Sequence, residues 1–147
     1  MLFRSSLGIN LIEYLTCILS RKIPSHYQIN ILDNHHKKKI DYPSGTALML
    51  ANAVAIGKNK KFNSLKGKIF FNKKGSPKEK KINFFITRKG NTIGKHSVLF
   101  KNKVENIELK HTAFYRELFA DGALNAAIWI SKKNRGLFNM QDMFSLK

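Results

Sequence analysis

Apolar side chains recur along this chain with two periods, one typical of helices and one typical of strands. Residues 6–21 and 117–131 place apolar side chains three or four positions apart, which predicts two amphipathic helices. Residues 44–56 are almost continuously apolar after Ser44, a residue type that favours a helix N-cap, and they predict a third helix. The stripe expected to be buried on the last helix consists of Leu118, Ala123, Ala126, Ala127 and Ile130.

Shorter segments that alternate in polarity, or that are rich in Ile, Val and Phe, predict strands. The expected strands are residues 27–33, 68–71, 82–88, 94–100 and 104–111. The second of them lies within a long, lysine-rich surface loop, residues 57–81, and turns are expected at residues 90–91 and 101–103. Because residues 83–87 put apolar side chains on both faces of the sheet, one face would stay exposed in a monomer, and we expect self-assembly.

The composition changes this picture mainly through charge. The chain has 147 residues, 43% of them hydrophobic, which suits one domain with its own core. A net charge of +18 would attract nucleic acid or an anionic membrane surface. Lysine greatly outnumbers arginine, however, and Asn, Ile and Phe are frequent, which indicates A- and T-rich codons. Because the lysines are spread over loops and strand ends, specific nucleic-acid binding is the less favoured interpretation.

The cysteine content and the first apolar stretch bear on the compartment. Cys17 is the one cysteine, so an internal disulfide is excluded and a reducing cytoplasm is favoured. Asn10 and Glu13 interrupt the apolar stretch at residues 7–19, which is too short and too polar to span a bilayer. It also lacks a cleavage site of small residues, so we expect neither membrane insertion nor secretion.

The segment His35–Ala47 (HHKKKIDYPSGTA) carries the candidate chemistry. Imidazole can donate a proton near neutral pH, lysine supplies a positive charge, and the backbone N–H groups of a helix's first turn hold an anion. These groups suit a small substrate that carries carboxylates and is protonated during the reaction. The adjacent histidines have no cysteine or carboxylate at ligand spacing, so no metal is expected.

Four ordered motifs resemble the dihydrodipicolinate reductase family. His35–Ala47 matches the family pattern His-His-x-x-Lys-x-Asp-x-Pro-Ser-Gly-Thr-Ala at each fixed position. Arg88–His96 (RKGNTIGKH) is similar to its strand-turn-strand, and residues 136–142 are similar to its C-terminal tail. Residues 111–116 and 119–123 are similar to its last long helix and the approach to it. The resemblance implies an α+β, two-layer domain with a mixed, mostly antiparallel sheet of about four strands packed on helices.

The resemblance also implies roles for single residues. His35 matches the catalytic proton donor that protonates the substrate ring as hydride arrives. Lys39 matches the lysine that holds the ring and stabilises developing negative charge. His36 matches a neighbouring substrate-binding histidine, and Gly45 and Thr46 match a clamp for a substrate carboxylate.

Four further residues receive smaller roles. Arg116 stands at a family arginine position and is given a minor role at most. Asp41 is expected to fix the loop by accepting backbone hydrogen bonds rather than to act as a base. His96 and His111 are expected to hydrogen-bond within the sheet.

The family further implies a cofactor and an assembly. Its members reduce a cyclic imine or enamine dicarboxylate with NADH or NADPH, giving tetrahydrodipicolinate for diaminopimelate and lysine synthesis, and they form homotetramers. The sequence contains no G-x-G-x-x-G turn for a dinucleotide. We therefore interpret residues 1–21 as an interdomain junction and first helix, residues 22–147 as the substrate-binding and oligomerisation domain, and the Rossmann domain as absent.

Several functional interpretations stay open at this point. The favoured one is the C-terminal part of a reductase with little or no activity alone, because hydride transfer needs the donor in near contact with the acceptor. A split enzyme, with the cofactor domain on another polypeptide, is a variant of it. A non-catalytic remnant of a decayed gene is the main alternative, and a basic nucleic-acid-binding module is a weaker one.

Overall fold

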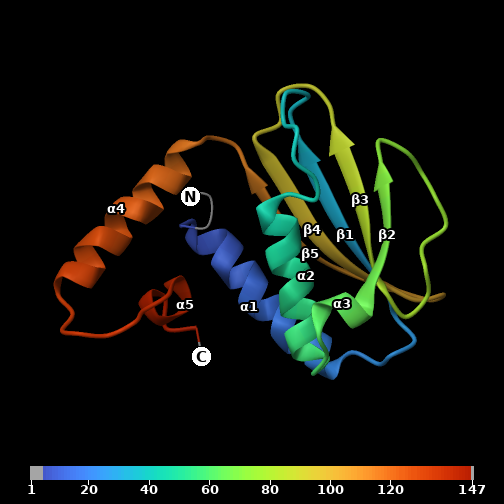
Figure 1. The fold of residues 1–147 in the computed structure, drawn as a ribbon, viewed down its shortest axis with the longest axis horizontal. Coiled ribbons are helices and arrows are strands. Elements are labelled where there is room, and N and C mark those ends of the chain that lie inside the picture. The colour runs from blue at the N-terminus through green and yellow to red at the C-terminus, as the bar shows by residue number, and fades with distance from the viewer. Residues whose placement is uncertain (1–4, 147) are drawn as a thin grey trace.

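The computed structural model describes residues 5–146, so the first four residues of the predicted junction lie outside the described part. Five helices and five strands are present there (Figure 1). The helices are α1 (Leu7–Lys22), α2 (Gly45–Gly57), α3 (Phe62–Leu65), α4 (Glu117–Ser131) and α5 (Met140–Met143). The strands are β1 (Gln28–His35), β2 (Lys66–Phe71), β3 (Ile82–Arg88), β4 (Gly94–Lys101) and β5 (Asn106–Ala113). The α+β class and the three long helices agree with the sequence pattern.

The strands form one mixed sheet in the order β2-β3-β1-β4-β5. The expectation of about four mostly antiparallel strands is wrong in detail, because five strands make two parallel and two antiparallel pairings. Residues 90–91 do not close a hairpin, since β3 and β4 lie on opposite sides of β1 and the connection passes over its end. β1 is therefore the central strand, and its last residue opens the His35–Ala47 segment.

Helices α1 and α2 cover one face of this sheet and form the core with it (Figure 1). The apolar run after Ser44 is buried on nearly all sides, which explains why α2 is hydrophobic throughout rather than along one stripe. The largest fully buried apolar side chains of the sheet come from its three middle strands. They are Ile31, Ile82, Phe84, Ile86, Val98 and Phe100.

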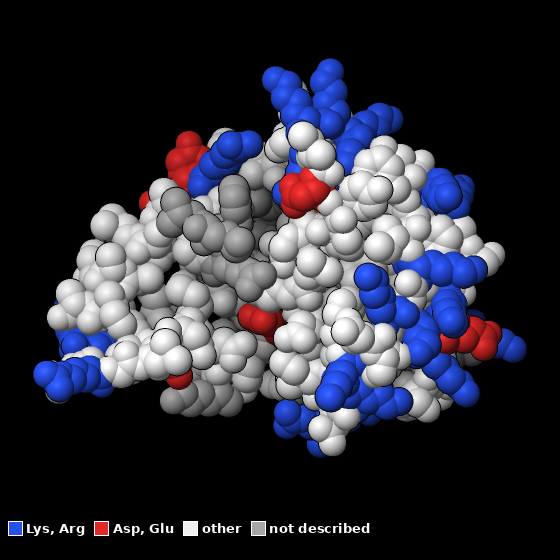
Figure 2. Space-filling view, viewed as in Figure 1, with Lys and Arg blue, Asp and Glu red and all other residues white. Residues whose placement is uncertain are grey.

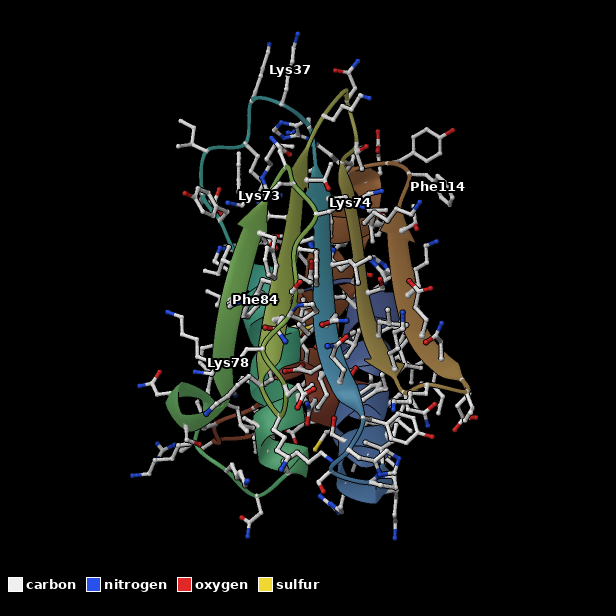
Figure 3. The ribbon with its side chains drawn as sticks, turned by 90° about the vertical axis from the view of Figure 1, so that its right-hand side faces the viewer. Lys37, Lys73, Lys74, Lys78, Phe84 and Phe114 are labelled. Carbon is white, nitrogen blue, oxygen red and sulfur yellow. The ribbon has the colours of Figure 1, made fainter. Side chains whose placement is uncertain are left out.

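The other face of the sheet carries the connection from β2 to β3. Figure 3 shows this lysine-bearing segment, residues 72–81, crossing in front of the strands on the side away from the helices. Asn83 holds the segment, because its side-chain amide donates to the Lys78 carbonyl and accepts from the Lys78 N–H. The ring of Phe70 stacks on Phe85 beneath it, with centroids 4.8 Å apart. The segment therefore covers part of the apolar surface of this face, while Leu32 and Leu99 on the same face stay partly exposed.

Helices α1 and α4 leave apolar side chains in solvent. On α1 the apolar positions that set the helical pattern, Leu7, Leu11, Leu15 and Ile18, are exposed. The buried stripe expected on α4 is not observed, since Gly122 is the buried residue of that helix. The physical reason is that α4 lies beside the α1 layer and away from the sheet (Figure 1), so most of its surface meets no other described element.

Two smaller findings complete the fold. The predicted loop 57–81 contains the short helix α3, which the sequence pattern did not indicate. Among residues 5–146, no helix combines the length and apolar character needed to cross a membrane.

Candidate active site

A pocket of about 440 Å³ opens at the end of the sheet where β1 finishes. Its size is within the range of small-molecule sites. Residues from β1, the following loop, the start of α2, the two antiparallel strands and the approach to α4 meet there. The polar lining residues are His35, His36, Lys39, Asp41, Ser44, Thr46, His96, His111 and Arg116. All six residues that the sequence assigned to the site, including Gly45, therefore line one pocket.

The first turn of α2 forms one wall of the pocket. Ser44 is a true N-cap, because its Oγ accepts a hydrogen bond from the Ala47 N–H at 3.2 Å. Gly45 and Thr46 follow directly and line the pocket, with Thr46 buried. The N–H groups of a helix's first turn and the positive end of its dipole favour an anion at this position.

Behind the pocket lies a buried carboxylate, Asp33, for which the sequence pattern indicated no role. Its Oδ1 is 2.8 Å from Nδ1 of His35, and its Oδ2 accepts a hydrogen bond from the Ser44 N–H at 2.7 Å. Arg88 Nη2 donates to the same Oδ2 at 3.2 Å. Burial alone would raise the pKa of Asp33, but the contacts with His35, Ser44 and Arg88 lower that pKa well below its usual range.

His96 was expected to hydrogen-bond within the sheet. It lies on β4 and lines the pocket instead. Its Nε2 lies 3.2 Å from Ser44 Oγ and 3.6 Å from Asp33 Oδ1. Burial lowers the pKa of His96 to about 3, so this ring is neutral at physiological pH. His111, opposite it on β5, also lines the pocket, and burial lowers its pKa as well.

The loop between β1 and α2 places the cationic side chain of Lys39 in the lining of the pocket. Lys39 Nζ donates to Asp41 Oδ1 at 2.7 Å, and this bond is the main cause that lowers the pKa of Asp41. The expectation that the Asp41 carboxylate is held chiefly by backbone groups is therefore wrong. Its backbone carbonyl instead accepts from Arg88 Nη2 at 2.9 Å, which anchors the loop.

His36 follows His35 and also faces the pocket. Desolvation lowers the pKa of His36, and the positive charge of Arg116 lowers it further. The loop backbone is fixed to the β3–β4 connection, because the Lys37 N–H donates to the Gly90 carbonyl at 3.1 Å and the Lys89 N–H donates to the His35 carbonyl at 3.0 Å.

The fold also assembles a potential ligand set that sequence spacing did not reveal. One ligand atom each of Asp33, His35 and His96 lies within 4.8 Å of the others. The guanidinium of Arg88 already occupies Oδ2 of the shared carboxylate, however, and its charge opposes a cation there. One signal could have found Asp33, because residues two apart on a strand share a face and His35 was already a candidate. Arg88 and His96 come from other strands, and only their pairing with β1 brings them in.

Comparison with known proteins identifies a family model and relatives that match nearly the whole chain. The family model described as "Dihydrodipicolinate reductase, C-terminus" matches residues 8–144. The 4-hydroxy-tetrahydrodipicolinate reductase of Pelagibacter ubique (strain HTCC1062) is 50% identical over 142 residues, which are 97% of this chain and 55% of that protein. The enzyme of the same name from Buchnera aphidicola subsp. Cinara cedri is 48% identical over 140 residues, or 94% of this chain and 50% of that protein.

A solved structure gives the same fold. The dipicolinate-bound dihydrodipicolinate reductase from Paenisporosarcina sp. TG-14 superimposes with a TM-score of 0.71 and 19% sequence identity, over 95% of this chain and 52% of that one. The chain spans about half the length of the curated relatives it matches. The family match over residues 8–144 and the identity to these relatives show that this chain belongs to the dihydrodipicolinate reductase family, in the C-terminal part of that family's sequence.

Proposed function

We propose that this chain provides the substrate-binding part of a 4-hydroxy-tetrahydrodipicolinate reductase that uses NADH or NADPH. The observation that carries the proposal is the convergence of His35, Lys39 and the first turn of α2 on one pocket. A proton donor, a cation and an anion-binding helix end are the groups that reduction of a cyclic dicarboxylate requires. Such a reaction draws on the NAD(P)H pool, which is consistent with a place in the cytoplasm.

The substrate carboxylates would bind where the positive potential is highest. One carboxylate accepts N–H bonds from Gly45 and Thr46 at the start of α2, with the Thr46 hydroxyl beside them. The other substrate carboxylate pairs with Lys39, whose ion pair with Asp41 breaks when the substrate binds. Asp41 is solvent-exposed, so exchanging one carboxylate partner for another costs little. His36 and Arg116 border the same space and add binding contacts.

His35 would supply the proton. Its Nδ1 faces Asp33, so Nε2 is the ring nitrogen available to a substrate. A methyl group on Gly94 would sit 3.4 Å from this Nε2, and the missing side chain therefore keeps the approach to the acid open. Lys39 beside the ring stabilises the negative charge that develops as the ring accepts hydride.

The residues described here do not fit a nicotinamide dinucleotide. The chain has no G-x-G-x-x-G turn, and the loop before α2 is lysine-rich instead of glycine-rich. The hydride donor therefore has to be held by residues other than those described, and the roles assigned here concern the substrate and the proton only.

We further propose that the chain assembles as a homotetramer through the sheet face that lies away from the helices. Leu32, Phe85 and Leu99 supply apolar contacts at the centre of that face. Figure 2 shows basic side chains gathered on the sheet side of the molecule, so salt should strengthen the assembly by screening repulsion. Light scattering at low and high ionic strength tests this, and a monomer at all salt concentrations would contradict it.

Turnover with a supplied cofactor half tests the main proposal. The chain is mixed with the dinucleotide-binding half of the Pelagibacter ubique relative, and oxidation of NADH and of NADPH is followed with 4-hydroxy-tetrahydrodipicolinate. We expect turnover that requires both parts and that falls by about 10²–10⁴-fold in His35→Gln. The matched control His26→Gln changes an exposed histidine outside the pocket and should leave the rate unchanged. Failure of the assembled pair to turn over would favour a non-catalytic remnant.

A further inference from the structure

The strongest unassigned feature is the buried carboxylate behind His35. Asp33 is 0% exposed, and its Oδ1 lies 2.8 Å from His35 Nδ1. Neither of these two atoms has another hydrogen-bond partner among the described residues. Because a buried polar atom without a partner is costly, each of them depends on the other.

The other oxygen of the same carboxylate is held from two directions. Arg88 donates to Oδ2 from β3, and the Ser44 N–H donates to it from the start of α2. Arg88 also donates through Nη1 to the Asp33 carbonyl at 3.0 Å, which fixes the guanidinium against the strand. These bonds leave the Asp33 side chain little rotational freedom, and its Oδ1 is consequently aimed at His35.

The surroundings of His35 leave one ring nitrogen for chemistry. The ring of His96 packs edge-on against it, with centroids 4.8 Å apart. Gly94 lies beside Nε2 and has no side chain to block it. Nδ1 therefore points into the protein at a carboxylate, while Nε2 points to the pocket.

We infer that Asp33, held by Arg88, is a positioning residue that keeps a proton on Nδ1 of His35 and thereby makes Nε2 the acid toward the pocket. This inference rests on the proposed role of His35. In the reaction the Nε2–H bond breaks and a C–H bond forms on the substrate ring, while hydride from the reduced nicotinamide completes the reduction of one double bond. His35 is left neutral with its remaining proton on Nδ1, and Asp33 stays ionised throughout.

The tautomer of His35 is the direct test, and it needs neither cofactor nor substrate. The ring nitrogens of ¹⁵N-labelled chain are observed by NMR above the titration of the histidines, with His35→Gln to assign the signals. We expect the neutral ring to carry its proton on Nδ1 with a preference of about tenfold or more, since a contact with a charged partner is strong. The exposed His26 serves as the reference ring and should show no such preference. A neutral His35 protonated mainly on Nε2 would overturn the inference.

Variants separate positioning from a purely structural role. Asp33→Asn removes the charge while keeping the shape, and we expect His35 to lose its Nδ1 preference. Arg88→Lys keeps the positive charge but not the forked geometry, and it should weaken the preference partially. If Asp33→Asn does not fold, the wild-type tautomer and Arg88→Lys decide the question. A folded Asp33→Asn chain that retains the wild-type preference would contradict the inference.

Failure of this inference can be told apart from failure of the proposed function. Titration with pyridine-2,6-dicarboxylate reports the pocket, and the NMR tautomer reports Asp33. A chain that binds the diacid but holds His35 in the other tautomer refutes only the positioning role. In the assembled two-part enzyme, Asp33→Asn should lower kcat with little change in the KM for the substrate.

Discussion

Helices α2 and α4 differ sharply in how far their apolar side chains are buried. Leu50 of α2 belongs to the core and is 0% exposed, whereas Leu124 of α4 is 62% exposed. Both residues belong to helices that the sequence predicted from their apolar side chains. The pocket end of the sheet is buried as α2 is, since Asp33, Arg88 and His96 are buried and hydrogen-bonded or ion-paired there.

The comparison teaches that an apolar pattern specifies an element but not its burial. α2 is buried because the sheet and α1 enclose it, while α4 meets few other described elements. Leu124, Ile128 and Ile130 are all exposed on α4, and exposed apolar side chains grouped on one element are typical of an interaction site. The stability of this chain is therefore expected to reside in the sheet and α2, with little contribution from α4.

The largest predicted difference comes from the same leucine-to-alanine substitution made once in α2 and once in α4. Leu50→Ala should reduce the free energy of unfolding by about 2–5 kcal/mol, because it leaves a cavity in the core. Leu124→Ala should change it by no more than about 0.5 kcal/mol, because the side chain is already in water. Urea unfolding followed by circular dichroism measures both. Equal losses would mean that α4 is packed as firmly as α2.

The pocket end should also make stability depend on pH. The pKa of His96 is about 3 in the folded chain, below the ordinary value of 6.5, so the unfolded chain binds more protons between those values. The stabilising contribution of neutral His96 is complete above about pH 6.5. The free energy of unfolding should therefore fall by about 3 kcal/mol between pH 7 and pH 4. Asp33, whose pKa is also lowered, extends the loss below about pH 4.

Two histidine variants check this origin of the acid sensitivity. In His96→Gln the unfolding midpoint should change less between pH 7 and pH 4, because the ring that takes up a proton on unfolding is gone. The exposed His26→Gln should leave the slope as it is. A wild-type midpoint that stays constant over this range would refute a buried, neutral His96.

Helix capping gives the smallest contrast. Ser44 caps α2 with its side chain, so Ser44→Ala should cost about 1 kcal/mol and up to about 2. Ser6 precedes α1 without a side-chain cap bond, so Ser6→Ala loses no capping hydrogen bond and should cost less than Ser44→Ala. Thermal melts of the two variants measure the difference, and a larger effect from Ser6→Ala would reverse the comparison.

The sequence predicted most elements and the outline of the site, but not the contacts between strands. The three long helices and five strand segments follow from local periodicity, and the His35–Ala47 segment is contiguous, so its residues had to lie together. The insertion of β1 between β3 and β4 depends on which strands pair, and local pattern does not encode this. Arg88 and His96 reach the pocket only through that pairing, and both were consequently given no part in it.

The burial of α4 was the other failure, for a different reason. Periodic spacing indicates which face of a helix is apolar, yet burial also requires a partner surface. Ala126 and Ile130 have the right spacing, but α4 makes no extensive contact with any strand among residues 5–146.

Calorimetric titration of this chain with pyridine-2,6-dicarboxylate at low ionic strength measures whether the pocket at the end of β1 binds a diacid. The account predicts binding of one diacid per chain, weakened by about tenfold or more in Lys39→Ala because a charged partner is removed. Lys38→Ala removes the same charge from a neighbouring exposed position and should leave the affinity nearly unchanged. No binding by the folded chain, or equal weakening by the two variants, would contradict a built site at the end of β1.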